Sequence, residues 1–374
     1  MDHIATIGDM REAARRRLPR PIFDFMDGAA FHEVTLRANT DDFEAIRFRL
    51  RPMRDVSTRN LSTTLLGQQA SMPAATAPIG LGGVMYGNDG EKLVARAAEK
   101  AGIPFTLGML SIATIEEVRA QVQNPFWFQF CMLKDRGLTK ALLDKAIEAG
   151  CPVLMMTVTW SASGLQSRMV RSGLNLPPRI NLQTFWDFAL KPLWVARFLT
   201  GKRVGFNNFE GLVDDPCDLP AIVGQLDNSM TWKDLEWLRE VWPGKIVIKG
   251  INSSEDANLA MEHGVDGVSV SNHGGNQLDH AASTISVLPH VAEGVDGRGT
   301  VLLDSGVRSG QDILKALALG ADGVLLGRAH LYGLGAYGQK GVEKALELIR
   351  YELDVSTAQT GLTDVRDASP KILV

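Results

Sequence analysis

Eight short apolar segments, separated by helical patterns, constrain the fold of this chain most strongly. Each has the length of a buried parallel strand, and they lie at residues 74–78, 104–107, 126–130, 152–158, 245–248, 266–270, 301–303 and 322–326. Helix stop signals lie between them, for example Gly102 after residues 90–101 and Gly150 after residues 138–149. Eight strand-helix repeats predict an α/β fold, a closed (β/α)8 TIM barrel with its active site at the carboxyl ends of the strands. A doubly wound open sheet is the second interpretation, although no G-x-G-x-x-G sequence follows the first strand.

Two stretches fall outside this repeat. The step from the fourth to the fifth strand takes roughly 90 residues, which is long for a connection and predicts an inserted region at 160–232. Its segment 184–199 mixes aromatic, aliphatic and basic side chains, and we interpret it either as an active-site lid or as a peripheral membrane contact. Residues 1–71 precede the barrel and predict a helical cap, in which Pro19 and Pro21 end the first helix. We expect residues 1–374 to form a single domain.

The composition excludes several classes of function. A net charge of −4 and scattered lysine and arginine residues give no basic surface, so we expect no nucleic-acid partner. The chain contains no apolar run of about 18 residues that would cross a membrane, and residues 1–20 lack a signal-peptide pattern. The cysteines Cys131, Cys151 and Cys217 are odd in number and lack metal-binding spacing. We therefore expect no metal site and a reducing, cytoplasmic location.

The sequence S-N-H-G-G-N-Q-L-D at residues 271–279 directly follows the sixth predicted strand. It places His273, whose side chain titrates near neutrality, at a strand end beside a turn that glycines make easily. Lys249 ends the strand one unit earlier, and Asp304 follows the strand one unit later. Because carboxyl ends of barrel strands meet at one rim, we expect these three side chains to share a site. A histidine before two glycines is also typical of an ordinary turn, so its role as a base depends on these neighbours.

Two glycine-rich segments follow the seventh and eighth strands. The first reads D-S-G-V-R-S-G at residues 304–310, and the second ends in Gly327 and Arg328. Glycines at strand ends let backbone N–H groups approach an anion, and arginines add charge-assisted hydrogen bonds. Because the corresponding loops of TIM barrels commonly bind phosphate, we interpret the two segments as a phosphate clamp; plain glycine-rich turns are the alternative.

Together, these segments resemble the FMN-dependent α-hydroxy acid oxidase and dehydrogenase family, which includes glycolate oxidase, lactate dehydrogenase and mandelate dehydrogenase. The resemblance extends from I-F-D-F at residues 22–25 to the final helix. It implies that FMN is the cofactor, that His273 is the active-site base, and that Lys249 lies near N1 of the flavin. It also implies a homotetramer. The other residues that it assigns to FMN are Ala77, Pro78, Ile79, Gly80, Gln129, Thr157, Asp304, Gly306, Arg308, Gly327 and Arg328.

Five positions on the substrate side depart from the family pattern. The family's two substrate arginines, the aspartate beside the histidine, and two tyrosines are replaced here by Asn276, Gln166, Thr159, Phe25 and Cys131. Neither asparagine nor glutamine neutralises a carboxylate as an arginine fork does. Short 2-hydroxy acids such as lactate or glycolate are therefore disfavoured as the best substrate. Arg168 and Arg171 could substitute for the lost arginines, although solvent-exposed loop arginines are common.

We therefore predict an FMN-dependent oxidoreductase that oxidises a C–H next to OH in a 2-hydroxy acid or a derivative. Asn276 and Trp160 are similar to an offshoot of the family that acts in mycofactocin maturation, so oxidation of an amine-bearing carbon is an alternative. A flavin-binding protein with a decayed substrate site is another, and a phosphate-binding barrel isomerase is the last.

Two sequence features bear on the electron acceptor: the loop after the first strand and the segment before the predicted barrel. The segment 77–83 looks like the dehydrogenase branch of the family, where a glycine lies near flavin N5. No haem domain precedes the predicted barrel, so we expect a separate acceptor, a quinone or another carrier in preference to oxygen. A membrane quinone would place the protein peripherally on the inner face of the membrane, held by the segment 184–199.

Overall fold

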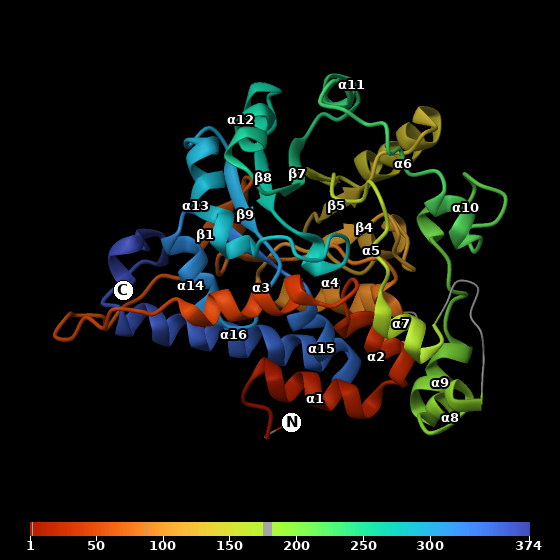
Figure 1. Cartoon of the computed structure of the whole chain (residues 1–374), viewed down its shortest axis with the longest axis horizontal. Coiled ribbons are helices and arrows are strands. Elements are labelled where there is room, and N and C mark those ends of the chain that lie inside the picture. Colours follow the sequence, from red (N-terminus) through yellow and green to blue (C-terminus); the bar gives the residue numbers. More distant parts are fainter. Residues whose placement is uncertain (2, 88, 175–181) are drawn as a thin grey trace.

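The computed structural model describes residues 1–374 except 2, 88 and 175–181, and a parallel barrel lies at its centre (Figure 1). The barrel strands are β3 (Ala74–Thr76), β4 (Thr106–Gly108), β5 (Trp127–Phe130), β6 (Val153–Thr157), β7 (Lys245–Ile251), β8 (Gly267–Val270), β9 (Thr300–Leu303) and β10 (Gly323–Leu326). They pair in the order β3-β10-β9-β8-β7-β6-β5-β4, and each overlaps one expected apolar segment. The backbone N–H of Thr76 donates to the carbonyl of Pro104 at 3.0 Å, which brings the two end strands together. The (β/α)8 prediction is confirmed, and the open sheet is excluded.

A short hairpin closes the amino-terminal end of the barrel. Its strands are β1 (Thr63–Leu65) and β2 (Gln68–Ala70), joined by Leu66 and Gly67, both at positive φ. Two central residues at positive φ make the type of turn that suits a two-residue hairpin. Leu65 is fully buried among inward-facing side chains of the barrel strands. This hairpin lies within residues 1–71, for which the sequence indicated helices alone.

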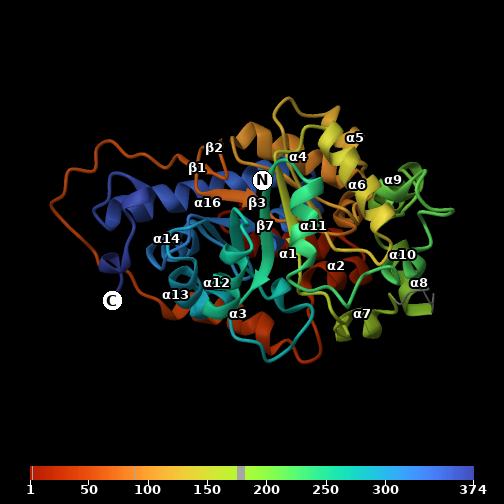
Figure 2. The same ribbon diagram turned by 90° about the horizontal axis from the view of Figure 1, so that it is seen from above.

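The outer layer of helices surrounds the strands (Figure 2). Its members are α4 (Gly90–Ala101), α5 (Ile115–Arg119), α6 (Arg136–Glu148), α11 (Asp234–Val241), α12 (Ser254–Glu262), α13 (Thr284–Val295), α14 (Gly310–Ala318), α15 (Arg328–Tyr337) and α16 (Gln339–Gln359). Local sequence signals set their ends. The Ser309 hydroxyl caps α14 by accepting from the N–H of Asp312, and Gly102 ends α4 in the left-handed conformation.

The amino-terminal cap contains α1 (Ile7–Arg17), α2 (Arg20–Asp27) and α3 (Val34–Ala45). The helix α1 ends before Pro19, and Pro21 lies in the first turn of α2, as the sequence predicts. In Figure 1, α1 runs beside α15, and the two helices pack together. Between α2 and α3, the N–H of Ala30 donates to the carbonyl of Gly275 at 2.9 Å. The cap therefore reaches the strand-end turn that contains the predicted base.

The region between β6 and α11 folds into α7 (Ser167–Ser172), α8 (Leu182–Ala189), α9 (Pro192–Thr200), the 3-10 turn η2 (Asn207–Phe209) and α10 (Leu219–Val223). Both views place α8 and α9 at an outer edge of the molecule (Figures 1 and 2). One side of this pair is anchored, because the indole N–H of Trp194 donates to the carbonyl of Val84 at 2.9 Å. The Asn208 side chain likewise accepts from the N–H of Ile115 at 2.8 Å. The insertion is thus fixed to loops near the carboxyl ends of the strands.

Candidate active site

The strand register brings the predicted polar residues to one level of the barrel. Thr157 pairs with Lys249 across β6 and β7, and Lys249 pairs with Ser269 across β7 and β8. Lys249 is buried, and its ammonium group lies 2.7 Å from the Asp304 carboxylate. It also donates to the hydroxyl of Ser271 at 3.0 Å. A buried cation with two partners is thereby fixed at the carboxyl ends of the strands.

His273 occupies an uncommon backbone conformation. It begins the short turn η3 (His273–Gly275) at φ 58°, and Gly274 follows at φ 66°. The Asn272 side chain holds this turn by accepting from the N–H of Gly275 at 3.2 Å. Left-handed backbone at a residue other than glycine is strained, and such strain concentrates at functional sites. The conformation is consistent with an imidazole that is held in place for chemistry.

The surroundings of His273 favour a neutral imidazole. Burial, followed by the nearby Lys249 cation, lowers the pKa of His273 to about 3, and the Asp304 carboxylate offsets only part of this effect. Its Nδ1 lies 2.9 Å from the hydroxyl of Thr159, and the ring of Trp160 contacts it edge-on at 6.0 Å between centroids. A neutral ring can accept a proton at neutral pH. The uncharged Thr159, however, stabilises a protonated ring less than a carboxylate would.

Two side-chain amides lie beside His273. The Gln166 amide donates to the Asn276 carbonyl oxygen at 3.2 Å, and the Asn276 amide donates to the His273 backbone carbonyl at 2.8 Å. The side-chain oxygen of Gln166, Oε1, is buried without a hydrogen-bond partner among the described residues. A buried acceptor of this kind favours a ligand that offers an N–H or O–H group.

Arg168 does not serve as a replacement arginine in this arrangement. Its guanidinium group is held by the carboxylates of Asp27 and Glu33. Despite its burial, Asp27 has a pKa lowered to about 2 by hydrogen bonds from Arg11 and Tyr332 and by the nearby arginine charges. Arg171 is exposed to solvent. In the described conformation the Arg168 charge is already compensated, so Arg168 would have to leave these carboxylates to bind a substrate.

The residues expected on the flavin ring and substrate at the end of β5 are buried, and Phe25 on α2 is partly buried. The Gln129 amide donates to the Thr157 hydroxyl at 2.9 Å and contacts the Cys131 sulfur at 3.5 Å. Burial raises the pKa of the Cys131 thiol to about 12, so it remains protonated and is no nucleophile. Phe25 on α2 packs against the hydrophobic core.

The backbone after β3 crosses this rim of the barrel. It contains Ala77, Pro78, Ile79 and Gly80. The N–H of Ala77 donates to the carbonyl of Leu326 at 2.7 Å, which ties the segment to β10. The N–H of Leu81 donates to the carbonyl of Leu110 at 2.8 Å, which ties it to the loop after β4. The segment is therefore held from both sides.

The loop between β9 and α14 requires a glycine. Gly306 has φ 109°, and a side chain there would overlap the carbonyl of Asn39. The neighbouring Arg308 donates one guanidinium N–H to the carbonyl of Val307 at 2.9 Å, which leaves its other guanidinium donors without a hydrogen bond among the described residues.

Arg328 begins α15, and Gly327 precedes it. The amino terminus of a helix favours anions, because its first N–H groups lack intrahelical acceptors. The Arg328 side chain donates to the carbonyls of Met26, Gly28 and Gly274 at 3.0, 2.7 and 3.0 Å. In this structure, Arg328 thus also joins the cap to the turn that contains His273, a role that its sequence motif does not reveal.

Comparison with known proteins identifies the family. The family model described as FMN-dependent dehydrogenase matches residues 14–374. The chain belongs to the FMN-dependent dehydrogenase family. It is 45% identical to an L-lactate dehydrogenase of Xanthobacter autotrophicus, over 99% of this chain and 96% of the relative. It is 43% identical to an L-lactate dehydrogenase of Allorhizobium ampelinum, over 99% of both chains. A crystal structure of the monotopic membrane protein (S)-mandelate dehydrogenase matches with a TM-score of 0.95 and 36% identity, covering 100% of this chain and 99% of that one.

The donor set of this FMN-dependent dehydrogenase fits its cofactor. An isoalloxazine ring that gains negative charge needs a fixed cation, and Lys249 is buried at the rim. A phosphate needs backbone donors and positive charge, which the amino terminus of α15 and Arg308 supply. A Cβ atom at Gly327 would contact only Ala77, at 3.7 Å, so the backbone there is open to a close approach.

Two polar residues of this FMN-dependent dehydrogenase were not singled out from the sequence. Ser271 binds both the Lys249 ammonium and the N–H of His273, and Asn272 braces the turn and binds Asn39 in the cap. Both belong to the S-N-H-G-G sequence, so the signal was present. Their roles depend on contacts with distant segments, which the motif alone does not show.

Proposed function

We propose that this FMN-dependent dehydrogenase oxidises a carbon bearing a hydroxyl group, in a 2-hydroxy acid or a derivative of one, with His273 as the base. The observation that carries the proposal is the placement of His273, which is held in a strained turn beside the buried Lys249–Asp304 ion pair. Burial keeps its imidazole unprotonated, so one ring nitrogen has a lone pair for the substrate's hydroxyl proton as the carbon is oxidised.

Each residue at the rim has a role in this proposal. The chemistry that bound FMN supplies is two-electron oxidation of the substrate carbon. Lys249, which Asp304 orients, would balance negative charge on the bound ring. Gln129, Thr157 and the backbone of residues 77–80 would hold the ring. Gly306, Arg308, Gly327 and Arg328 would hold the phosphate.

The substrate side favours a ligand without a free carboxylate. Gln166 and Asn276 are uncharged and hydrogen-bonded to each other, and Arg168 is occupied by two carboxylates. A buried carboxylate facing two amides would lack a counter-charge. Hydroxy esters and hydroxy amides fit better than lactate or mandelate, on which the related dehydrogenases are named to act.

A second candidate function is oxidation of an amine-bearing carbon. The unpartnered oxygen of Gln166 favours it, because an amine or amide N–H of a peptide-derived substrate could donate to this atom. In this second function, His273 takes the proton from the substrate's nitrogen rather than from a hydroxyl oxygen. A flavin-binding protein with a decayed site is the remaining alternative, since it would also explain the altered substrate residues.

An anaerobic panel tests these functions. The purified yellow protein is mixed with 2-hydroxy acids, their esters and amides, and amines, and the flavin absorbance is followed. We expect rapid bleaching by an ester, amide or amine, and slower bleaching by the free acids. Bleaching by amines alone would select the second function. A flavin that no member of the panel bleaches would support the decayed site.

We further propose that electrons leave to a quinone near a membrane. No described helix is long and apolar enough to cross one. However, α8, α9 and their connection expose large apolar side chains, which we call the insertion patch: Leu182, Phe185, Trp186, Leu190, Leu193 and Leu199. Lys191 lies in the connection between α8 and α9, and its ammonium group binds the carbonyl of Arg16 at the basic end of α1. Apolar side chains bordered by cations are typical of contact with anionic lipid surfaces. A cytoplasmic, peripheral location and a homotetramer remain part of this proposal.

Lipid binding can be measured directly. We expect the protein to co-sediment with vesicles that contain anionic lipid, and Leu193→Glu combined with Trp186→Glu to reduce the bound fraction at least about fivefold, because charge is placed where apolar contact is needed. Leu50→Glu is the matched control, since Leu50 is 68% exposed but lies outside the patch. Equal loss in the control, or no sedimentation of the parent protein, would leave the insertion as a lid.

A further inference from the structure

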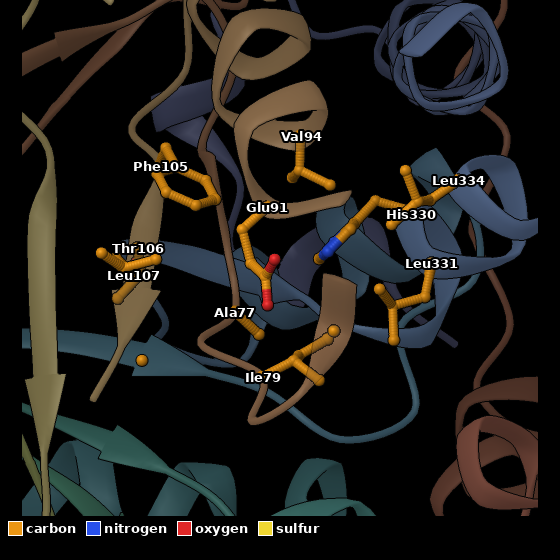
Figure 3. A pocket seen from close by; sticks show the side chains of 12 residues that line it. Ala77, Ile79, Glu91, Val94, Phe105, Thr106, Leu107, His330, Leu331 and Leu334 are labelled. Atoms are coloured by element: carbon orange, nitrogen blue, oxygen red, sulfur yellow. The ribbon is translucent and has the colours of Figure 1, made fainter. Parts of the chain in front are cut away.

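A small cavity lies between the segment after β3, the strand β4, and the helices α4 and α15 (Figure 3). Its volume of about 20 Å³ is enough for roughly one water molecule. Among its lining residues, Glu91 and His330 are the ionisable ones. Ala77, Ile79 and Gly82 also line it, so the cavity borders the segment proposed to face the flavin.

Glu91 connects two loops at the rim of the barrel. Its Oε1 accepts from the N–H of Gly83 at 2.8 Å and from the N–H of Ile112 at 3.1 Å. Its Oε2 is buried without a hydrogen-bond partner among the described residues. An uncompensated carboxylate in such a place is costly, and burial raises the pKa of Glu91. A proton or a hydrogen-bond donor in the cavity would satisfy Oε2.

His330 presents the complementary group. It is 3% exposed, and its Nδ1 lies 2.7 Å from the carbonyl of Leu326. A carbonyl can only accept, so Nδ1 carries the hydrogen, and Nε2 of the neutral ring is an acceptor. Burial lowers the pKa of His330 to about 4. Figure 3 shows the imidazole and the Glu91 carboxyl group directed toward the same space.

The same Leu326 carbonyl also accepts from the N–H of Ala77 at 2.7 Å. His330 therefore binds the same carbonyl group that ties the segment after β3 to β10. This carbonyl belongs to the residue directly before Gly327. Glu91 holds the far end of that segment through Gly83. Thr106 on β4 also lines the cavity, and its hydroxyl has no hydrogen-bond partner within the described part of the chain.

We propose that Glu91 and His330 share one proton through a water bound in this cavity, and that the pair positions residues 77–83 against the flavin. In one form, the Glu91 hydroxyl donates to the water, which donates to Nε2 of His330. In the other, the proton has moved along the same path, leaving a carboxylate and an imidazolium. Both forms have zero net charge. Glu91 and His330 are positioning residues, and this part of the proposal rests on assigning residues 77–80 to the flavin.

Infrared spectroscopy tests the shared proton. We expect the FMN-loaded protein to show the carbonyl band of a protonated, hydrogen-bonded carboxyl group, absent in Glu91→Gln and moved to higher frequency in His330→Phe. Glu352→Gln is the matched control, because the Glu352 pKa is also raised by burial at a site away from the cavity. Nitrogen NMR of the histidines assigns the His330 protons. An imidazolium beside a Glu91 carboxylate is the other form of the pair and also supports the proposal. A band unmoved in His330→Phe, or an ionised Glu91 beside a neutral His330, overturns it.

FMN affinity tests the positioning role separately. Glu91→Ala leaves the N–H groups of Gly83 and Ile112 without their acceptor, and we expect the dissociation constant for FMN to rise at least about tenfold. Glu91→Gln keeps an acceptor oxygen and should change it less than about threefold. If Glu91→Ala does not fold, His330→Phe takes its place, with a rise of about threefold expected. Unchanged affinity in folded Glu91→Ala, or in His330→Phe where it takes its place, overturns the positioning role. A shared proton found together with unchanged affinity would instead show that residues 77–80 are wrongly assigned to the flavin.

Discussion

Replacing His273 with alanine is expected to leave FMN bound and to slow flavin reduction by the cognate substrate by a factor of about 10² to 10⁴. The imidazole is the group proposed to take the substrate proton, and the Lys249–Asp304 ion pair next to it remains intact in this variant. Stopped-flow absorbance of the anaerobic protein measures the reduction rate, and the yellow colour of the purified variant shows that the cofactor is retained.

Thr159→Val is the matched control, because it removes the 2.9 Å contact to Nδ1 of His273 but keeps the ring. We expect a smaller loss than in His273→Ala. Equal rates in His273→Ala and the parent would assign the proton transfer to another group.

The pH dependence carries a further expectation about the base. Because the pKa of His273 is lowered to about 3, the ring stays neutral as pH falls from 8 to 5, and the reduction rate should show no loss from its protonation in that range. Thr159→Asp supplies a carboxylate next to the ring, raises its pKa, and should introduce such a loss on the acid side.

Restoring both arginines at the substrate site is expected to speed the oxidation of small 2-hydroxy acids about tenfold or more. In the double variant Gln166→Arg with Asn276→Arg, two guanidinium groups replace the side-chain amides that are now hydrogen-bonded to each other at 3.2 Å. Charge-assisted, bidentate bonds then offset the desolvation of the substrate carboxylate. The ratio kcat/KM for L-lactate and for (S)-mandelate measures the gain.

The double lysine variant at the same two positions is the control. It adds the same charge without the planar fork, and we expect a smaller gain. No gain with arginine, in a protein that retains FMN, would mean that the shape of the pocket or the neutral Thr159 limits these substrates.

The barrel could be predicted from the sequence because eight apolar segments alternate with helix signals. The grouping of Lys249, His273 and Asp304 followed, since the carboxyl ends of neighbouring strands must meet. The hairpin at Leu66 was not predicted, because its strands have three residues each and a leucine rarely adopts φ 50°. The capture of Arg168 by two carboxylates of the cap could not be predicted either, since it joins segments far apart in the chain.

The three carbonyl groups that Arg328 binds have a consequence for how this molecule is made. Met26 and Gly28 are synthesised before the first barrel strand, whereas Arg328 and the rest of α15 follow the last one. The helix α1 likewise packs on α15, so this contact of α1 forms only after α15 has been synthesised. Contacts between such distant segments form slowly, because a long loop must close first. The cap therefore lacks these partners until α15 has been synthesised, and Arg328 braces the turn that contains His273 only then.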